Sequence, residues 1–168
     1  ISEIFRTLRT NIQFMNTKKS LKSILVTSTS PGEGKSWIAA NLAVAFAQAG
    51  KKVILVDADM RKGRQFSIFG VAPTPGLSNY LSGISSSGED SSGNILMYVQ
   101  ETEVENLYII PAGNIPPNPS ELLITEQMEE CLEKLKETFD LVVFDGTPSD
   151  LVTDAIILSR YADTTLIV

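Results

Sequence analysis

One segment of the chain restricts the possible folds more than any other. An apolar run at 22–28 leads, through a turn containing Gly32 and Gly34, into a stretch whose apolar residues recur at helical spacing. That stretch ends at Gly50, a residue type that commonly follows the last turn of a helix. A buried strand, a glycine-rich turn and a helix in this order indicate an α/β domain.

The turn at 29–36 reads TSPGEGKS and matches the phosphate-binding pattern GxxxxGK[ST], except that Thr29 replaces the first glycine. Its glycines let successive backbone N–H groups point at phosphate oxygens, and the helix N-terminus adds to the attraction. Lys35 can reach the β- and γ-phosphates, and the Ser36 hydroxyl can ligate Mg²⁺. Because the turn lies between a strand and a helix, the sequence predicts nucleotide binding rather than a simple glycine-rich turn. The residues expected around the nucleotide are Pro31, Gly32, Glu33, Gly34, Lys35, Ser36 and Trp37.

Three carboxylates follow two further apolar runs. Asp57 and Asp59 end VILVDAD, and Asp145 ends LVVFD. Ligands of open parallel sheets bind beyond the carboxyl ends of the strands, so these acids should converge near the phosphate loop. We expect Asp145 to hold the Mg²⁺ shell through water, one of the other acids to lie near the metal, and one to lie near an attacking hydroxyl or water. A single acid at a strand end is as often a solvated turn or a helix cap, whereas three beside a phosphate loop favour a functional role.

The remaining segments continue the alternation of strands and helices. They predict a mostly parallel central sheet flanked by helices, in a single domain over 1–168. A Ser/Gly-rich loop is expected at 82–94, and a Pro-rich turn at 114–123 precedes a long helix whose apolar stripe ends at Phe139. An N-terminal helix is expected at 1–15, with one apolar stripe made of Ile1, Ile4, Phe5, Leu8, Ile12 and Met15. Strands are expected at 22–28, 51–59, 106–113, 140–146 and 163–168, and a further helix at 154–162.

Composition limits the chemistry that the site can use. The chain has no histidine, which excludes a Ser-His-Asp triad, a histidine-ligated zinc and a histidine base, so a carboxylate is the obvious base. Its single cysteine, Cys131, cannot form an intramolecular disulfide. The net charge of −6 argues against general binding to nucleic acid or to an anionic membrane, and no stretch resembles a signal peptide or a membrane span. We therefore expect no nucleic-acid partner and no direct membrane insertion of this chain.

Several of these segments resemble a known family. SPGEGKS, ILVDADMR and LVVFDG resemble the deviant-Walker ATPases, the P-loop proteins that include septum-positioning and plasmid-partition ATPases. Within that group, EIFRTLRTN, GLSNYLSG and PAGNIPPNPSELL resemble the bacterial tyrosine kinases of capsule and exopolysaccharide synthesis. Partition ATPases carry a signature lysine near the start of the phosphate loop, where this chain has Ser30, so the kinase branch is favoured.

The resemblance implies ATP and Mg²⁺ as cofactors and gives each site residue a role. It identifies Lys35 and Ser36 as the Walker A lysine and metal ligand, and Asp145 as the Walker B acid. It places Asp57 to accept the tyrosine hydroxyl proton and Asp59 near Mg²⁺. The implied catalytic residues are Lys35, Asp57, Asp59 and Asp145, and the implied metal-binding residues are Ser36, Asp59 and Asp145. When no phosphate is bound, we expect Lys35 to be exposed, so that its loss costs little stability.

The implied function is that of an autophosphorylating, ATP-dependent protein tyrosine kinase that regulates capsular or exopolysaccharide synthesis and export. Such kinases phosphorylate a tyrosine cluster in their own C-terminal tail. The tyrosines Tyr80, Tyr98, Tyr108 and Tyr161 are scattered, and the chain stops within a predicted strand at Val168. We therefore expect a fragment of a longer protein whose tail lies beyond Val168.

Assembly and location are also implied by the resemblance. Glu3, Arg6 and Arg9 match the ExxRxxR motif, through which neighbouring subunits of these kinases form a homo-oligomeric ring. On charge pattern alone the same residues are typical of a solvated face with a local Glu3–Arg6 pair. The family further implies a membrane-spanning polysaccharide copolymerase as activating partner, and a cytoplasmic location at the inner face of the plasma membrane through that partner.

Two alternative functions stay open. One is a partition-type ATPase that uses ATP to dimerise on a surface. The other is a weakly catalytic, nucleotide-binding scaffold of a polysaccharide exporter. The scaffold hypothesis draws on DGTPS at 145–149, where the kinases usually have Asp-Thr-Pro-Pro. Arg61 follows the DxDxR pattern of the family, but RKGRQF at 61–66 stands where a proline and a histidine are common.

Overall fold

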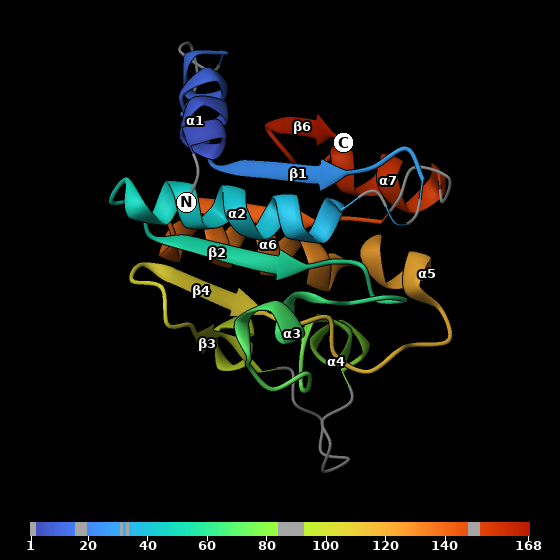
Figure 1. Ribbon diagram of the computed structural model, residues 1–168. Coiled ribbons are helices and arrows are strands. Elements are labelled where there is room, and N and C mark those ends of the chain that lie inside the picture. Colours follow the sequence, from blue (N-terminus) through green and yellow to red (C-terminus); the bar gives the residue numbers. More distant parts are fainter. Residues whose placement is uncertain (1–2, 16–19, 31, 33, 84–92, 148–151) are drawn as a thin grey trace.

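The computed structural model describes residues 3–15, 20–30, 32, 34–83, 93–147 and 152–168 (Figure 1). The strands in this part of the chain are β1 (Ser23–Thr27), β2 (Val53–Asp57), β3 (Gln100–Glu101), β4 (Leu107–Ile110), β5 (Leu141–Asp145) and β6 (Thr164–Ile167). They form one sheet in the order β3–β4–β2–β5–β1–β6. All neighbouring pairs are parallel except the edge strand β3, which runs antiparallel to β4. The mostly parallel sheet predicted from the sequence is confirmed.

Helices cover both faces of this sheet. They are α1 (Glu3–Met15), α2 (Lys35–Gln48), α3 (Gln65–Phe69), α4 (Leu77–Ser82), the 3₁₀ helix η1 (Ile95–Tyr98), α5 (Pro119–Leu123), α6 (Glu126–Thr138) and α7 (Val152–Ser159). Figure 1 shows α2 across one face of the sheet and α6 behind the opposite face. Within the described ranges, no helix is long and apolar enough to span a membrane.

The apolar residues of each central strand divide between two cores, because neighbouring side chains of a strand point to opposite faces. Ile24 and Val26 belong to the core that includes Phe46 of α2, whereas Leu25 belongs to the core that includes Leu135 of α6. Every residue of β1, β2 and β5 is buried. Strands covered on both faces need apolar residues at successive positions, which explains the uninterrupted apolar runs in the sequence.

The apolar stripe expected along the N-terminal helix is only partly buried. Phe5 and Ile12 are buried, and Leu8 packs partly against the same core. Ile4 and Met15 are 74% and 78% exposed, so part of the stripe lies at the surface. The physical reason is that α1 contacts mainly one neighbour, α2, and one helix cannot cover so wide a stripe. Figure 1 shows α1 at the margin of the domain, next to β1 and α2.

The sequence predicted a Pro-rich turn over the whole of 114–123, but only the first half of this segment lacks helical structure. Its second half is α5, which begins at Pro119, a position where the missing N–H removes no helical hydrogen bond. Ile124 and Thr125 then separate α5 from α6. Of the loop predicted at 82–94, residues 84–92 lie outside the described part of the chain.

The single cysteine provides a direct test of this packing. Cys131 lies in α6 with its side chain fully buried, and burial raises the pKa of its thiol to about 12. Because the thiolate is the reactive form, we predict that the native protein does not react with the thiol reagent DTNB at mildly alkaline pH. Absorbance should show reaction of one thiol only after urea is added. Rapid reaction in native buffer would contradict the packing of α6 against the sheet.

Candidate active site

Three loops meet where the central strands end. β5 lies between β1 and β2, and Asp145 at its end pairs in register with Val26 of β1 and with Asp57 of β2. The phosphate loop leaves β1 at this edge, and the segment that contains Asp59 leaves β2 beside it. Because the strands are parallel, their order brings together the three segments that the sequence singled out.

The phosphate loop depends on two glycines for its backbone conformation. Gly32 has a φ of 81° and Gly34 a φ of 78°, in the left-handed region that other residues avoid. A Cβ atom at either glycine would meet nothing within 4 Å, so the requirement concerns the torsion angle and not the space. Gly34 is the N-cap of α2, and the first N–H groups of a helix have no partner within the helix. An anion can therefore bind at this end of α2. Pro31 and Glu33 lie outside the described residues.

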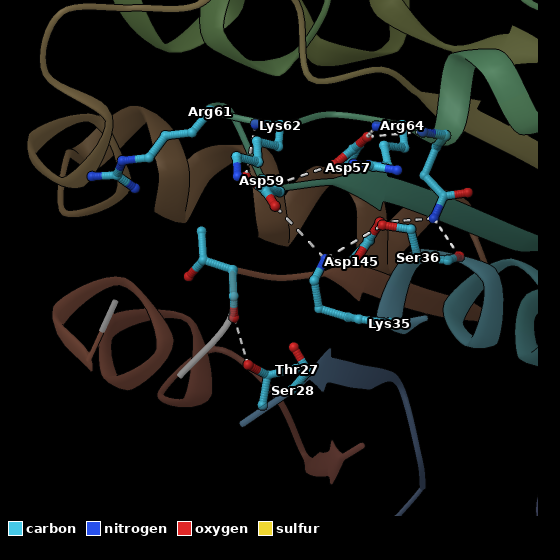
Figure 2. Close-up of polar contacts among 12 residues, drawn as sticks. Thr27, Ser28, Lys35, Ser36, Asp57, Asp59, Arg61, Lys62, Arg64 and Asp145 are labelled. Atoms are coloured by element: carbon cyan, nitrogen blue, oxygen red, sulfur yellow. Dashed lines mark hydrogen bonds and ion pairs between the residues drawn. The ribbon is translucent and has the colours of Figure 1, made fainter. Parts of the chain in front are cut away.

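Lys35, the first residue of α2, points into the acidic cluster and not into solvent (Figure 2). Its ammonium forms an ion pair with Asp145 and lies 3.8 Å from Oδ2 of Asp59. It also donates to the Ser36 hydroxyl at 3.5 Å. Lys35 is only 6% exposed, so the expectation that it would be exposed is wrong. The cause is the local charge, because the buried carboxylates of Asp145 and Asp59 attract the Lys35 ammonium.

Asp57 organises the segment that follows β2. Its Oδ2 accepts hydrogen bonds from the backbone N–H groups of Arg64 at 2.9 Å and Gln65 at 3.1 Å, and its Oδ1 accepts from Asp59 N at 3.2 Å. Burial, followed by the charge of Asp145, raises the pKa of Asp57 from 3.8 to about 8. The N–H of Gln65 and the charge of Lys35 act in the opposite direction but are outweighed. Burial therefore favours the protonated form of Asp57.

A cavity of about 520 Å³ opens beside the phosphate loop. Lys35, Ser36 and Asp59 are among the residues that line it, whereas Asp57 and Asp145 are fully buried and do not. Apolar and cationic side chains also line the cavity, namely Trp37, Phe66, Ile68, Lys62 and Arg64. The structure thus brings all the predicted acids together but opens only Asp59 to the cavity.

Gln65 also belongs to the site, although no pattern in the sequence indicated it. Its side chain is fully buried, and Nε2 donates to Ser36 O and to Oδ2 of Asp145, both at 2.8 Å. A glutamine within the charged stretch RKGRQF is typical of an exposed loop. Only the fold, which brings the start of α3 against β5 and α2, shows that it contacts the acidic cluster.

Arg61 also makes a contact that the sequence did not predict. Figure 2 shows its guanidinium pointing away from the three acids. It forms an ion pair with Asp154 of α7, which is 2% exposed and also accepts a hydrogen bond from the Ser120 hydroxyl of α5. These contacts tie the segment after β2 to two helices that follow it at much higher residue numbers. Nothing in the residue spacing links the three positions.

The arrangement fits a magnesium nucleotide. Two carboxylates, those of Asp59 and Asp145, share the single ammonium of Lys35. In the described part of the chain, no three acidic or cysteine side chains form a preformed metal cage. Mg²⁺ commonly binds through one or two carboxylates, phosphate oxygens and water, so a cage is not needed. Oε1 of Gln65 is buried without a protein partner among the described residues and can accept a hydrogen bond from such a water.

Comparison with known proteins identifies the family. The AAA domain family matches residues 21–168. The tyrosine-protein kinase YwqD of Bacillus subtilis (strain 168) is 43% identical over 167 residues, which cover 99% of this chain and 67% of YwqD. The putative tyrosine-protein kinase CapB of Staphylococcus aureus is 41% identical over 160 residues, which cover 95% of this chain and 67% of CapB. The chain belongs to the bacterial tyrosine-protein kinases.

Solved structures agree with this kinase assignment. The chimerical protein CapA2B2 has a TM-score of 0.90 at 40% identity, with 99% of this chain and 70% of that chain covered. The kinase domain of the Escherichia coli tyrosine kinase ETK has a TM-score of 0.89 at 33% identity, covering 99% and 62%. The cell division ATPase MinD of Pyrococcus furiosus has a TM-score of 0.70 at 26% identity, covering 88% and 58%. The kinase domain therefore has a P-loop ATPase fold, which is a nucleotide-binding fold.

Two glycines mark the positions where this kinase chain departs from the family pattern. A Cβ on Gly146, directly after Asp145, would lie 2.7 Å from a methyl carbon of Leu25. A Cβ on Gly63 would lie 2.5 Å from Cβ of Ala112. A larger residue at either position requires its neighbours to move, so both departures match the local packing. Residues 148 and 149 of DGTPS lie outside the described residues.

Because Lys35 is buried in ion pairs, its replacement should affect stability as well as phosphotransfer. We predict that Lys35→Met abolishes phosphotransfer and also lowers the free energy of unfolding in magnesium-free buffer by about 3 kcal/mol, because buried carboxylates lose their cation. Urea unfolding of wild type, Lys35→Met and the exposed control Lys51→Met measures this difference. Equal unfolding midpoints for all three proteins would contradict the structural role of the Lys35 ion pairs.

Proposed function

We propose that this kinase domain transfers the γ-phosphoryl group of MgATP to tyrosine hydroxyls, including those of its own C-terminal tail. The observation that carries the proposal is the position of Lys35, which lies between the phosphate loop and two acids at the wall of an open cavity. A cation held there by carboxylates can move a short way to bind phosphate oxygens. Charge stabilisation and positioning supply most of the catalysis in phosphoryl transfer.

The residues divide the work as follows. Backbone N–H groups of the phosphate loop and of the first turn of α2 bind the phosphates, and Lys35 offsets the charge that builds up during transfer. Ser36, Asp59 and Asp145 would hold Mg²⁺, which would supply positive charge to stabilise the phosphates during transfer. We propose that Asp57 is the base that accepts the tyrosine proton. This role requires its ionised form, and the charge of a bound Mg²⁺ nearby would lower its raised pKa. Three backbone N–H groups also donate hydrogen bonds to its carboxylate. Asp59 lines the cavity, so its role as an alternative base should be tested alongside that of Asp57.

The acceptor tyrosine has to come from outside this chain segment. Tyr80 and Tyr98 are 9% and 8% exposed and pack edge to face with each other. Tyr108 packs against Phe139, and the Tyr161 hydroxyl donates to Leu123 O at 3.0 Å. None of these four tyrosines lines the cavity. These contacts support an acceptor beyond Val168 or on another copy of the protein.

Phosphotransfer can be tested with an acceptor supplied in trans. We predict that the chain transfers ³²P from labelled MgATP to tyrosine in a random copolymer of glutamate and tyrosine. Asp57→Asn should lower the rate by roughly 10²- to 10⁴-fold, as the loss of a general base does. Asp140→Asn is the matched control, because this exposed aspartate lies just before β5, at the end of the strand opposite Asp145. Release of phosphate to water without labelled tyrosine would instead favour the partition-type ATPase.

We also propose that α1 takes part in a ring of kinase subunits. Glu3 and Arg6 are exposed, and no ion pair joins them among the described residues. Exposed apolar side chains, Ile4 and Phe14, lie on the same helix. Arg9 differs from the other two charged residues, because its Nη1 donates to Ala45 O of α2 at 2.8 Å and so holds α1 on its own subunit. A second copy of this chain is the partner that these exposed residues would contact.

The ring proposal separates the roles of these charged residues. We predict that the double variant Glu3→Ala with Arg6→Ala lowers the molar mass measured by light scattering and reduces phosphorylation between subunits. The variant should still bind ATP, because α1 does not line the cavity. Arg160→Ala, at an exposed position just after α7, serves as the control. If the double variant and wild type have the same mass at matched concentration and salt, these charges form only a solvated face.

A membrane-spanning activator and a location at the inner face of the plasma membrane remain parts of this proposal. Their support is the relationship to longer kinases. The tyrosine-protein kinase Wzc of Salmonella typhimurium is 39% identical over 166 residues, but the chain covers only 22% of Wzc. Related kinase domains therefore occur within much longer polypeptides. Regulation of capsular or exopolysaccharide synthesis and export is proposed on the same family grounds.

A further inference from the structure

Two side chains share the carboxylate of Asp145. Lys35 forms an ion pair with Oδ1, and Gln65 donates from Nε2 to Oδ2 at 2.8 Å. The proposed function, on which this inference rests, requires Lys35 to move to the nucleotide phosphates. Asp145 then loses its cation at the step in which it has to face Mg²⁺. Gln65 is the side chain that can stay on Asp145 through that change.

We propose that Gln65 is a positioning residue that holds Asp145 against the phosphate-loop helix while Lys35 moves between carboxylates and phosphates. The same Nε2 that donates to Asp145 also donates to Ser36 O at 2.8 Å. One amide group therefore fixes the end of β5 to the first turn of α2. Ser36 and Asp145, two of the three proposed metal-binding residues, are held close together by this bridge.

The orientation of the Gln65 amide follows from its partners. Ser36 O and the Asp145 carboxylate are both acceptors, so the NH₂ group has to face them. The reversed amide would place Oε1 against two acceptors, at a cost and without a hydrogen bond. The backbone is fixed as well, because Gln65 N donates to Asp57 at 3.1 Å and the residue is fully buried. Gln65 is thus held at both its backbone and its amide, as positioning requires.

The test compares the magnesium dependence of nucleotide binding, which does not require kinase activity. Fluorescent ADP is titrated at a series of Mg²⁺ concentrations with wild type, Gln65→Met, Gln65→His and Gln100→Met. Gln65→Met keeps much of the side-chain size without a donor, and Gln65→His restores one N–H donor. Gln100→Met is the matched control, because Gln100 also makes two amide hydrogen bonds, both to the Ala72 backbone on the far side of β4.

We expect Gln65→Met to raise the Mg²⁺ concentration for half-maximal ADP binding by roughly 10- to 100-fold, as outer-shell replacements do at metal sites. Affinity for ADP without Mg²⁺ should change little, Gln65→His should recover part of the effect, and Gln100→Met should behave like wild type. If Gln65→Met does not fold, Gln65→His carries the test, with a shift smaller than 10-fold but larger than that of Gln100→Met.

A wild-type magnesium dependence in the folded Gln65 variants would overturn the proposal. Equal loss of ADP affinity with and without Mg²⁺ would also overturn it, because that result indicates a general packing defect. Failure of the tyrosine phosphorylation assay would leave this binding result intact. The two proposals can therefore fail separately.

Discussion

The ion pairs of Lys35 with Asp145 and Asp59 are the interaction on which the rest of the site depends. Asp57 and Asp145 end neighbouring parallel strands in register, so their carboxyl groups are brought together at the edge where the phosphate loop leaves the sheet. Burial, and then the nearby charge of Asp145, raise the pKa of Asp57. The Lys35 ammonium reduces the repulsion between these carboxylates. Lys35 can do so because it is the first residue of α2, directly after the N-cap Gly34, and its side chain points into the acidic cluster.

The same charge arrangement prepares the site for a metal nucleotide. A lysine paired with carboxylates inside the protein needs no reorganisation of solvent to reach phosphates that bind at the adjacent helix end. Mg²⁺ can replace its charge beside Asp59 and Asp145 when it moves. The hydrogen bonds made by Asp57 to the segment after β2, and by Gln65 between β5 and α2, do not depend on Lys35. We propose that Lys35 moves while these hydrogen bonds keep the surrounding segments in place.

The order of strands and helices and the meeting point of the acids could be predicted from the sequence, whereas most side-chain contacts of the site could not. Apolar runs buried on both faces and the pattern GEGKS determine the strand–loop–helix order, and strand ends in a parallel sheet determine where the acids meet. Burial of Lys35 could not be predicted, because it depends on the sum of charges at the site. Gln65 and Asp154 acquire their partners from segments far away along the chain. Arg9, grouped with Glu3 and Arg6 by spacing, instead donates to Ala45 O, because a helix of its own subunit lies beside it.

The movement of Lys35 is the central claim, and a crystal structure of this chain with Mg²⁺ and a non-hydrolysable ATP analogue tests it most directly. The account predicts that Nζ of Lys35 contacts phosphate oxygens and has left Asp145, while Gln65 keeps its hydrogen bonds to Ser36 O and Asp145. A structure in which Lys35 remains paired with Asp145 while the nucleotide is bound would contradict it.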